Sequence, residues 1–249
     1  MINYRTLPVI LVILTLALGC AMDREVRLKR SRAMEDMGLA QLQRGNTGEG
    51  LKHLKEAASL DPESADIQHE LALAYKAMGA YTEAIEHFHK ALSLRPTFPA
   101  ARNNLGTVYL IKGNWDQAIE EFKKAADDFT YATPHFAYNN LGLAYYNKGN
   151  YEKALESYKK AVGLMPNYSV GLMNMGITFE AMGKKKEAED AYRRAVSTDP
   201  EYALVRLQLG KLLLATGRRA EAEKELQKAM EFDPAGRAGR EAKELLRQK

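Results

Sequence analysis

Apolar and small residues recur along this chain with a period longer than any single helix. An apolar residue followed by glycine or alanine returns at steps of 34, 34, 36, 34 and 34 residues: Met37-Gly38, Leu71-Ala72, Leu105-Gly106, Leu141-Gly142, Met175-Gly176 and Leu209-Gly210. A fixed period of this length indicates stacked copies of one supersecondary unit. The units expected are residues 31–64, 65–98, 99–134, 135–168, 169–202 and 203–236.

The first half of each unit has the pattern of a helix that ends at glycine. In the fourth unit, Leu141, Ala144 and Tyr145 follow helical spacing. The expected last turns reach Gly45, Gly79, Gly113, Gly149, Gly183 and Gly217. Glycine ends a helix well because it adopts the left-handed conformation without Cβ strain.

The second half of each unit predicts another helix, antiparallel to the first. Two small residues flank one large residue, as Ala154, Tyr158 and Ala161 do in the fourth unit, and this spacing puts all three on one helix face. Small side chains let two helices approach closely. A proline ends the second helix in five units: Pro62, Pro96, Pro166, Pro200 and Pro234.

These residues and their period resemble the tetratricopeptide repeat, whose pattern is Leu-Gly, Tyr, Gly, Ala, an aromatic residue, Ala and Pro. The resemblance covers residues 31–236 and implies an all-α fold, a right-handed superhelix (solenoid) of six helix-turn-helix repeats. The first unit departs most, with Gln41 in place of Tyr and Gly50 in place of Ala, as is usual for a terminal repeat. Residues 237–249 are expected to form a C-terminal capping helix.

The N-terminus has the layout of a signal peptide. Arg5 precedes an uncharged stretch from Thr6 to Met22, which contains Gly19-Cys20. This stretch is short for a membrane-spanning helix, and it contains Pro8. The segment around Gly19-Cys20 resembles a bacterial lipoprotein signal, which implies removal of residues 1–19 and lipidation of Cys20.

The same resemblance implies a place for the mature protein. Ala21 follows the cysteine where Asp would retain a lipoprotein at the inner membrane, so we expect a lipid-anchored protein on the periplasmic face of the outer membrane. The alternative is an incidental Cys20 in a plain secretory signal or an uncleaved anchor. Residues 20–30 form the expected tether and the basic start of the first helix. The cations that follow Cys20 are expected either to lie against anionic lipid headgroups or to form a solvated helix face: Arg24, Arg27, Lys29, Arg30 and Arg32.

Composition narrows the range of possible functions. The chain has 36 Lys and Arg against 32 Asp and Glu, a net charge of +4 that is well interspersed, which disfavours nucleic-acid binding. The single cysteine excludes an internal disulfide and a multi-cysteine metal site. His87 and His89 are two residues apart on a predicted helix, so they do not share a face for a metal. We expect no enzyme, no metal, no cofactor and no small-molecule substrate.

The tetratricopeptide resemblance implies that the first helices line a concave groove. Its expected amide residues are Asn103, Asn104, Asn139, Asn140, Asn174 and Gln208. Three of them, Asn104, Asn140 and Asn174, recur at one repeat position and form an asparagine ladder. An amide both donates and accepts hydrogen bonds, so such a row can bind an extended peptide backbone. The alternative is that these amides only tie neighbouring helices together.

The groove positions of the last three units are apolar: Phe136, Leu143, Tyr146, Val170, Met173, Ile177, Leu204 and Leu207. Apolar residues in a groove predict a docking surface for a partner helix or hydrophobic segment. Aromatic and methionine residues at helical spacing are also typical of core, and that alternative stays open.

The third unit is two residues longer and ends in Tyr131-Ala132-Thr133-Pro134. This turn and the helix after it resemble the PilF/PilW family of type IV pilus biogenesis lipoproteins, the secretin pilotins. The resemblance implies a non-catalytic protein-interaction lipoprotein that assists assembly of the outer-membrane secretin, with the pilus secretin as partner. The alternatives are a general scaffold for another envelope complex, in cell-wall synthesis or protein export, and a regulatory subunit of a separate enzyme.

Overall fold

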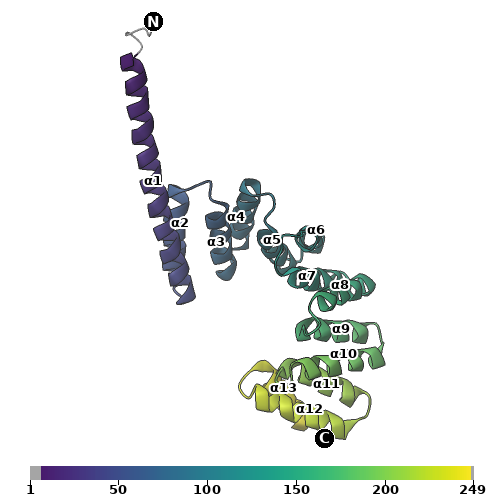
Figure 1. Ribbon diagram of the computed structural model, residues 1–249. Coiled ribbons are helices and arrows are strands. Elements are labelled where there is room, and N and C mark those ends of the chain that lie inside the picture. The colour runs from purple at the N-terminus through teal and green to yellow at the C-terminus, as the bar shows by residue number, and fades with distance from the viewer. Residues whose placement is uncertain (1–6, 248–249) are drawn as a thin grey trace. The chain divides into compact units, whose positions relative to one another are not determined.

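The computed structural model describes residues 7–247, with side chains from residue 23 onward. Within this range the chain forms thirteen helices and no strand, so the expected all-α class is confirmed. The helices divide into two compact units, Met1–Val108 and Tyr109–Lys249, which are described separately (Figure 1).

The first unit contains two helical hairpins and most of a fifth helix. Its elements are α1 (Leu7–Gln43), α2 (Thr47–Leu60), α3 (Ala65–Ala77), α4 (Tyr81–Leu94) and the start of α5 (Pro99–Ile111). α1 packs along α2 and α3 along α4, and α1 extends far beyond α2 toward the N-terminus (Figure 1). The expected signal peptide and the side chain of Cys20 lie outside the described side chains. No helix in the described part of the chain is both long and apolar enough to cross a membrane.

The second unit continues the same alternation of helices. Its elements are α6 (Trp115–Ala126), α7 (Pro134–Asn147), α8 (Tyr151–Leu164), α9 (Ser169–Ala181), α10 (Lys185–Thr198), α11 (Ala203–Ala215), α12 (Arg219–Phe232) and α13 (Arg237–Arg247). Each of α7, α9 and α11 packs against the helices before and after it. The last helix, α13, packs on α12 and α11 and covers apolar side chains there through Ala238 and Ala242.

Each hairpin is closed by a large side chain between two small residues. In the hairpin of α9 and α10, Ala188, Tyr192 and Ala195 are fully buried. The turn before α10 contains Gly183, whose φ of 74° is the left-handed value expected for a helix-ending glycine. Tight hairpins of this kind leave the first helix of each pair available on its other side, where the candidate site lies.

The lengthened turn between α6 and α7 is held by its own side chains. Asp128 accepts hydrogen bonds from the amide of Thr130 at 2.9 Å and from its hydroxyl at 2.6 Å. Phe129, between them, is 98% exposed, and Pro134 opens α7. The turn therefore has a fixed local shape and presents one aromatic side chain to solvent.

Candidate functional site

The first helices of the second unit carry the accessible part of the predicted apolar set. Phe136 on α7 is 43% exposed. The other accessible members are half-buried, and together with Phe136 we call them the apolar face: Leu143, Tyr146, Val170, Ile177 and Leu204. α7 and α9 contact each other directly, so their members of this face lie on neighbouring helices.

Two predicted groove residues instead belong to the interior. Met173 is 6% exposed and packs with Leu172 and Leu209 in the core of α9 to α12. Leu207 is 1% exposed and packs on Leu226 beneath α13. The packing alternative therefore describes these two side chains, because their surface is already covered by neighbouring helices.

An aromatic cluster stands at the start of α7. The ring centroids of His135 and Phe136 lie 4.2 Å apart, and Tyr168 meets both rings edge-on, at 5.4 Å and 5.8 Å. Burial lowers the pKa of His135 and raises the pKa of Tyr168 to about 12, so both rings are neutral at pH 7. Gly171 leaves room for Tyr168, since a Cβ there would lie 2.7 Å from its ring.

The repeat pattern did not predict His135 and Tyr168 as site residues. Tyr168 precedes α9 in a turn, outside the helical positions used to predict the groove. The cluster makes the exposed ring of Phe136 part of a larger apolar surface, which a partner side chain can cover.

Two of the predicted groove amides in the second unit connect two helices. Asn174 on α9 donates from Nδ2 to Oδ1 of Asn139 on α7 at 2.9 Å, and Asn139 is 6% exposed. Asn140 and Gln208 are half-buried. The helix-tying alternative describes the Asn139–Asn174 pair, while peptide capture by Asn140 and Gln208 stays a prediction.

In the first unit, Asn104 is the centre of another polar group. Its Oδ1 accepts from Nζ of Lys76 at 2.9 Å, and its Nδ2 lies 3.3 Å from Nε2 of His69. Burial lowers the pKa of Lys76. Asn103, next to it, is half-buried. Lys76 was not predicted from the sequence, although it lies on a first helix, where a polar residue in apolar surroundings indicates such a contact.

A carboxylate borders the apolar face. The hydroxyl of Tyr192 donates to Oε2 of Glu180 at 2.5 Å, and burial together with this bond raises the pKa of Tyr192. Burial also raises the pKa of Tyr146, with smaller contributions from Tyr151 and from the charge of Glu180. Glu180 occupies the place in its repeat that Tyr146 occupies in the preceding one, which is the signal that would have identified it.

His87 of α4 has a packing role. His87 stacks on Tyr75 with ring centroids 5.3 Å apart, and its Nδ1 lies 2.8 Å from Oε1 of Gln68. Burial lowers the pKa of His87. Among the side chains from residue 23 to 247, no group of three or more His, Cys, Asp or Glu is placed to hold a metal ion.

Comparison with known proteins identifies the repeat. The sequence profile of the tetratricopeptide repeat matches residues 63–130, 97–167 and 135–201, and a second profile of the same description matches residues 179–248. No curated protein matches the sequence.

Solved structures share the arrangement of helices. PilF of Pseudomonas aeruginosa is 23% identical with a TM-score of 0.73, and the match covers 90% of this chain and 99% of that one. PilW, described as a type IV pilus biogenesis factor, is 20% identical with a TM-score of 0.75, over 84% of this chain and 96% of that one. MamA is 25% identical with a TM-score of 0.60, over 67% of this chain and 96% of that one. The resemblance to the PilF/PilW proteins drawn from the sequence is thereby confirmed.

Proposed function

Because the chain belongs to the tetratricopeptide repeat family, we propose that it is a non-catalytic adaptor that docks a protein partner on the apolar face of its second unit. One observation carries this proposal. Phe136 keeps 43% of its surface in solvent although His135 and Tyr168 pack against it. A cluster of neutral aromatic rings at the surface is typical of a site that a helix or an apolar segment covers.

We further propose that the adaptor acts in type IV pilus biogenesis, as a pilotin that assists assembly of the outer-membrane secretin. Its likeness to PilF and PilW over nearly their whole length supports this role. Lipidation at Cys20 would hold the protein at the periplasmic face of the outer membrane. The mechanism is proximity, because an anchored adaptor raises the effective concentration of its partner where that partner is inserted.

In-cell photocrosslinking tests this function. A photoreactive residue replaces Phe136 in the full chain, and the trapped partner is identified by mass spectrometry. We expect a covalent adduct with the secretin. The matched control carries the same photoreactive residue at position 224, an exposed site on α12 outside the apolar face, and is expected to give no secretin adduct.

Other results have definite meanings. Capture of a different envelope protein at position 136, absent at position 224, retains the adaptor and removes the pilus role. A second photoreactive variant replaces Val170 of the same face. If neither position 136 nor position 170 captures a protein, the apolar face is not a docking surface and the proposal is wrong.

A further inference from the structure

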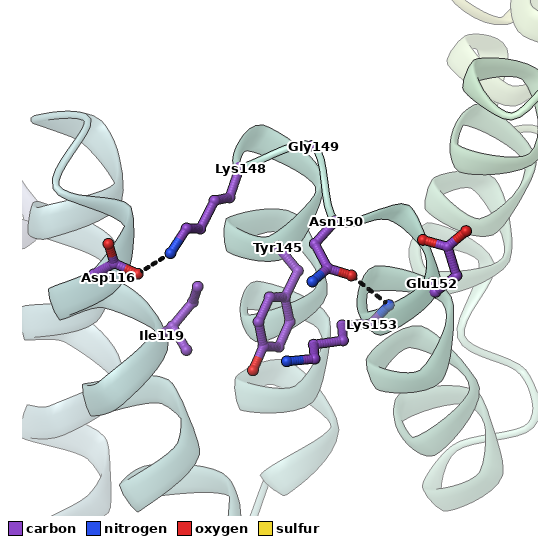
Figure 2. A pocket seen from close by; sticks show the side chains of 8 residues that line it. All are labelled: Asp116, Ile119, Tyr145, Lys148, Gly149, Asn150, Glu152 and Lys153. Atoms are coloured by element: carbon purple, nitrogen blue, oxygen red, sulfur yellow. Dashed lines mark hydrogen bonds and ion pairs between the residues drawn. The ribbon is translucent and has the colours of Figure 1, made fainter.

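A second candidate surface follows α7 between α6 and α8. Two hollows of about 480 Å³ and 270 Å³ adjoin there, because Tyr145 and Lys153 line both. Figure 2 shows the residues that line the larger one. Leu141 and Tyr145 of α7 form the floor, and α6 and α8 form the walls. We call the smaller hollow and its rim the lysine groove, after Lys123 of α6 and Lys153 and Lys160 of α8.

Two of these lysines converge on one aromatic ring. The Nζ atoms of Lys123 and Lys153 lie 5.8 Å and 5.6 Å from the ring centroid of Tyr145, and both side chains are exposed. The ring face attracts each ammonium group by its quadrupole. It does not neutralise their charge, so both ammonium groups beside this one ring remain cationic.

The carboxylates near the groove are mostly paired elsewhere. Glu156 pairs with Lys160 at 3.1 Å, and Asp116 pairs with Lys148. Among the described side chains, no carboxylate forms an ion pair with Lys123 or Lys153, the two ammonium groups over the ring. Glu152, at the rim of the larger hollow, is the remaining acidic neighbour. The groove therefore has a net positive charge.

Lys153 is also an exception within the repeat. It is the third residue of its helix, and the third residues of the other second helices are Glu49, Glu83, Gln117, Glu187 and Glu221. Acidic residues are favoured in the first turn of a helix, where the positive end of the macrodipole lies, and a lysine is disfavoured there. The substitution of Lys for Glu thus adds positive charge where the helix end is already positive.

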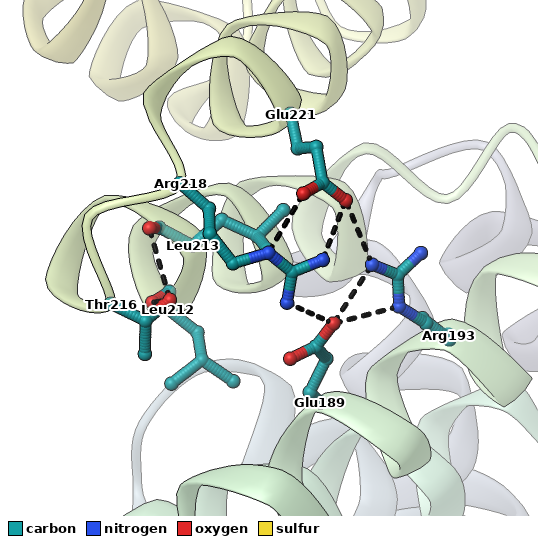
Figure 3. Close-up of polar contacts among 7 residues, drawn as sticks. All are labelled: Glu189, Arg193, Leu212, Leu213, Thr216, Arg218 and Glu221. Atoms are coloured by element: carbon teal, nitrogen blue, oxygen red, sulfur yellow. Dashed lines mark hydrogen bonds and ion pairs between the residues drawn. The ribbon is translucent and has the colours of Figure 1, made fainter.

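The equivalent groove over α11 contains opposite charges in place of the two lysines (Figure 3). Arg193, the ninth residue of α10 as Lys123 is the ninth of α6, pairs with Glu221 of α12 at 3.2 Å. Arg218 pairs with Glu221 and with Glu189, both at 2.6 Å, and Arg193 pairs with Glu189 at 2.8 Å. Opposite charges therefore close this groove from within, whereas the lysine groove lacks the carboxylate that would close it.

We propose that the lysine groove binds an acidic, extended peptide segment of a protein partner, whose side-chain carboxylates are held by Lys123 and Lys153. Charge complementarity supports this occupant, since an incoming carboxylate takes the part that Glu221 plays in the other groove. A concave slot between two helices accepts a narrow chain, while a lipid bilayer presents a broad surface. Ammonium groups bind carboxylates as point charges, so recognition depends on the acidic residues of the peptide more than on its exact sequence.

Fluorescence polarisation with the full chain and a fluorescein-labelled peptide of alternating glutamate and serine tests the proposal. We expect saturable binding that weakens as salt is added, because exposed charges are screened. Lys153→Glu places a carboxylate opposite Lys123, as in the groove over α11, and should lower affinity by at least about tenfold. Lys153→Arg keeps the charge and should retain binding.

The matched control is Lys224→Glu, the same charge change at an exposed site on α12, which should alter affinity by less than about twofold. Absence of peptide binding, or equal loss in Lys153→Glu and Lys224→Glu, would overturn the proposal. If inorganic phosphate displaces the peptide when both are at the same concentration, the groove is a site for small anions and the peptide proposal is wrong. If the protein binds no peptide but binds phosphatidylglycerol vesicles, and Lys153→Glu loses this binding, the groove is a membrane contact and the peptide proposal is wrong.

Discussion

Tyr158 and Tyr192 fill their hairpins because the residue facing each ring has no side chain. A Cβ at Gly142 would lie 2.5 Å from the ring of Tyr158, and one at Gly176 would lie 2.4 Å from the ring of Tyr192. Such distances are far inside van der Waals contact. Both rings are almost fully buried, and Tyr192 is also tied to Glu180 by its hydroxyl. In these two repeats the glycine is thus set by the aromatic ring opposite it.

Gly176→Ala should therefore destabilise the protein. The added methyl group overlaps a ring that cannot shift without breaking its hydrogen bond to Glu180, and overpacking of this kind costs about 1–3 kcal/mol. Urea unfolding followed by circular dichroism measures the loss as a lower midpoint.

The control for this change is Gly163→Ala near the end of α8, where a Cβ would meet nothing within 4 Å. Here alanine should raise stability by about 0.5–1 kcal/mol, because it restricts the unfolded chain and favours the helix. Equal effects at positions 163 and 176 would contradict the packing argument.

At the scale of elements, α10 and α12 are joined by the charged network of Figure 3. Glu189 is its central acceptor, bound by both Arg193 and Arg218. Burial raises the pKa of Glu189, but the hydrogen bonds and charges of the two arginines outweigh burial and leave that pKa below its ordinary value. The ionised carboxylate is therefore favoured by folding.

Glu189→Gln should lower the urea midpoint at pH 7, and the difference from the wild type should shrink in high salt. The pH dependence has a definite sign. Since the folded pKa lies below the unfolded one, the contribution of Glu189 is present above the unfolded value of about 4.3 and is lost as pH falls through the folded value. Urea titrations at pH 7 and in acid measure this; a difference that grows in acid would contradict it.

The sequence predicted the elements well, because each hairpin depends on local spacing. Ala188, Tyr192 and Ala195 define a helix face whatever surrounds it, and they are buried as that face requires. The site was harder to predict. Met173 and Val170 are both on α9, yet neighbouring helices bury Met173 and leave Val170 half-buried. Helical period gives the direction of a side chain but not which neighbour covers it.

Features that combine residues of several repeats are harder to predict from the sequence. Lys123 and Lys153 belong to different repeats and meet only because α6 and α8 both pack against α7. A comparison of equivalent positions would have found Lys153, since Glu or Gln occupies its place elsewhere. Tyr168 had no such signal, because Tyr202 occupies the same place in the next repeat. Contacts between repeats therefore need the structure, while contacts within one follow from the pattern.

At the scale of the whole molecule, the remaining question is what holds the protein at its place of action. Arg24, Arg27 and Arg32 of α1 are exposed, so headgroup attraction is one available source of attachment. Lipidation of Cys20 is the other, and each buried methylene of an acyl chain contributes about 0.8 kcal/mol. The two differ in salt dependence, because acyl burial is unaffected by screening and headgroup attraction is not.

Cys20→Ala in the full chain separates these sources. We expect the unaltered protein to stay with the membrane fraction through a high-salt wash and to incorporate labelled palmitate, and the variant to lose both properties. Replacement of Arg24, Arg27 and Arg32 by glutamine is the control and should leave membrane attachment intact. Tight attachment of Cys20→Ala after the salt wash would show that the apolar N-terminal segment anchors the chain without lipid. If Cys20→Ala stays with the membrane fraction until salt releases it, the basic residues hold the protein there. Either of these two results would remove the lipid tether from the proposed mechanism.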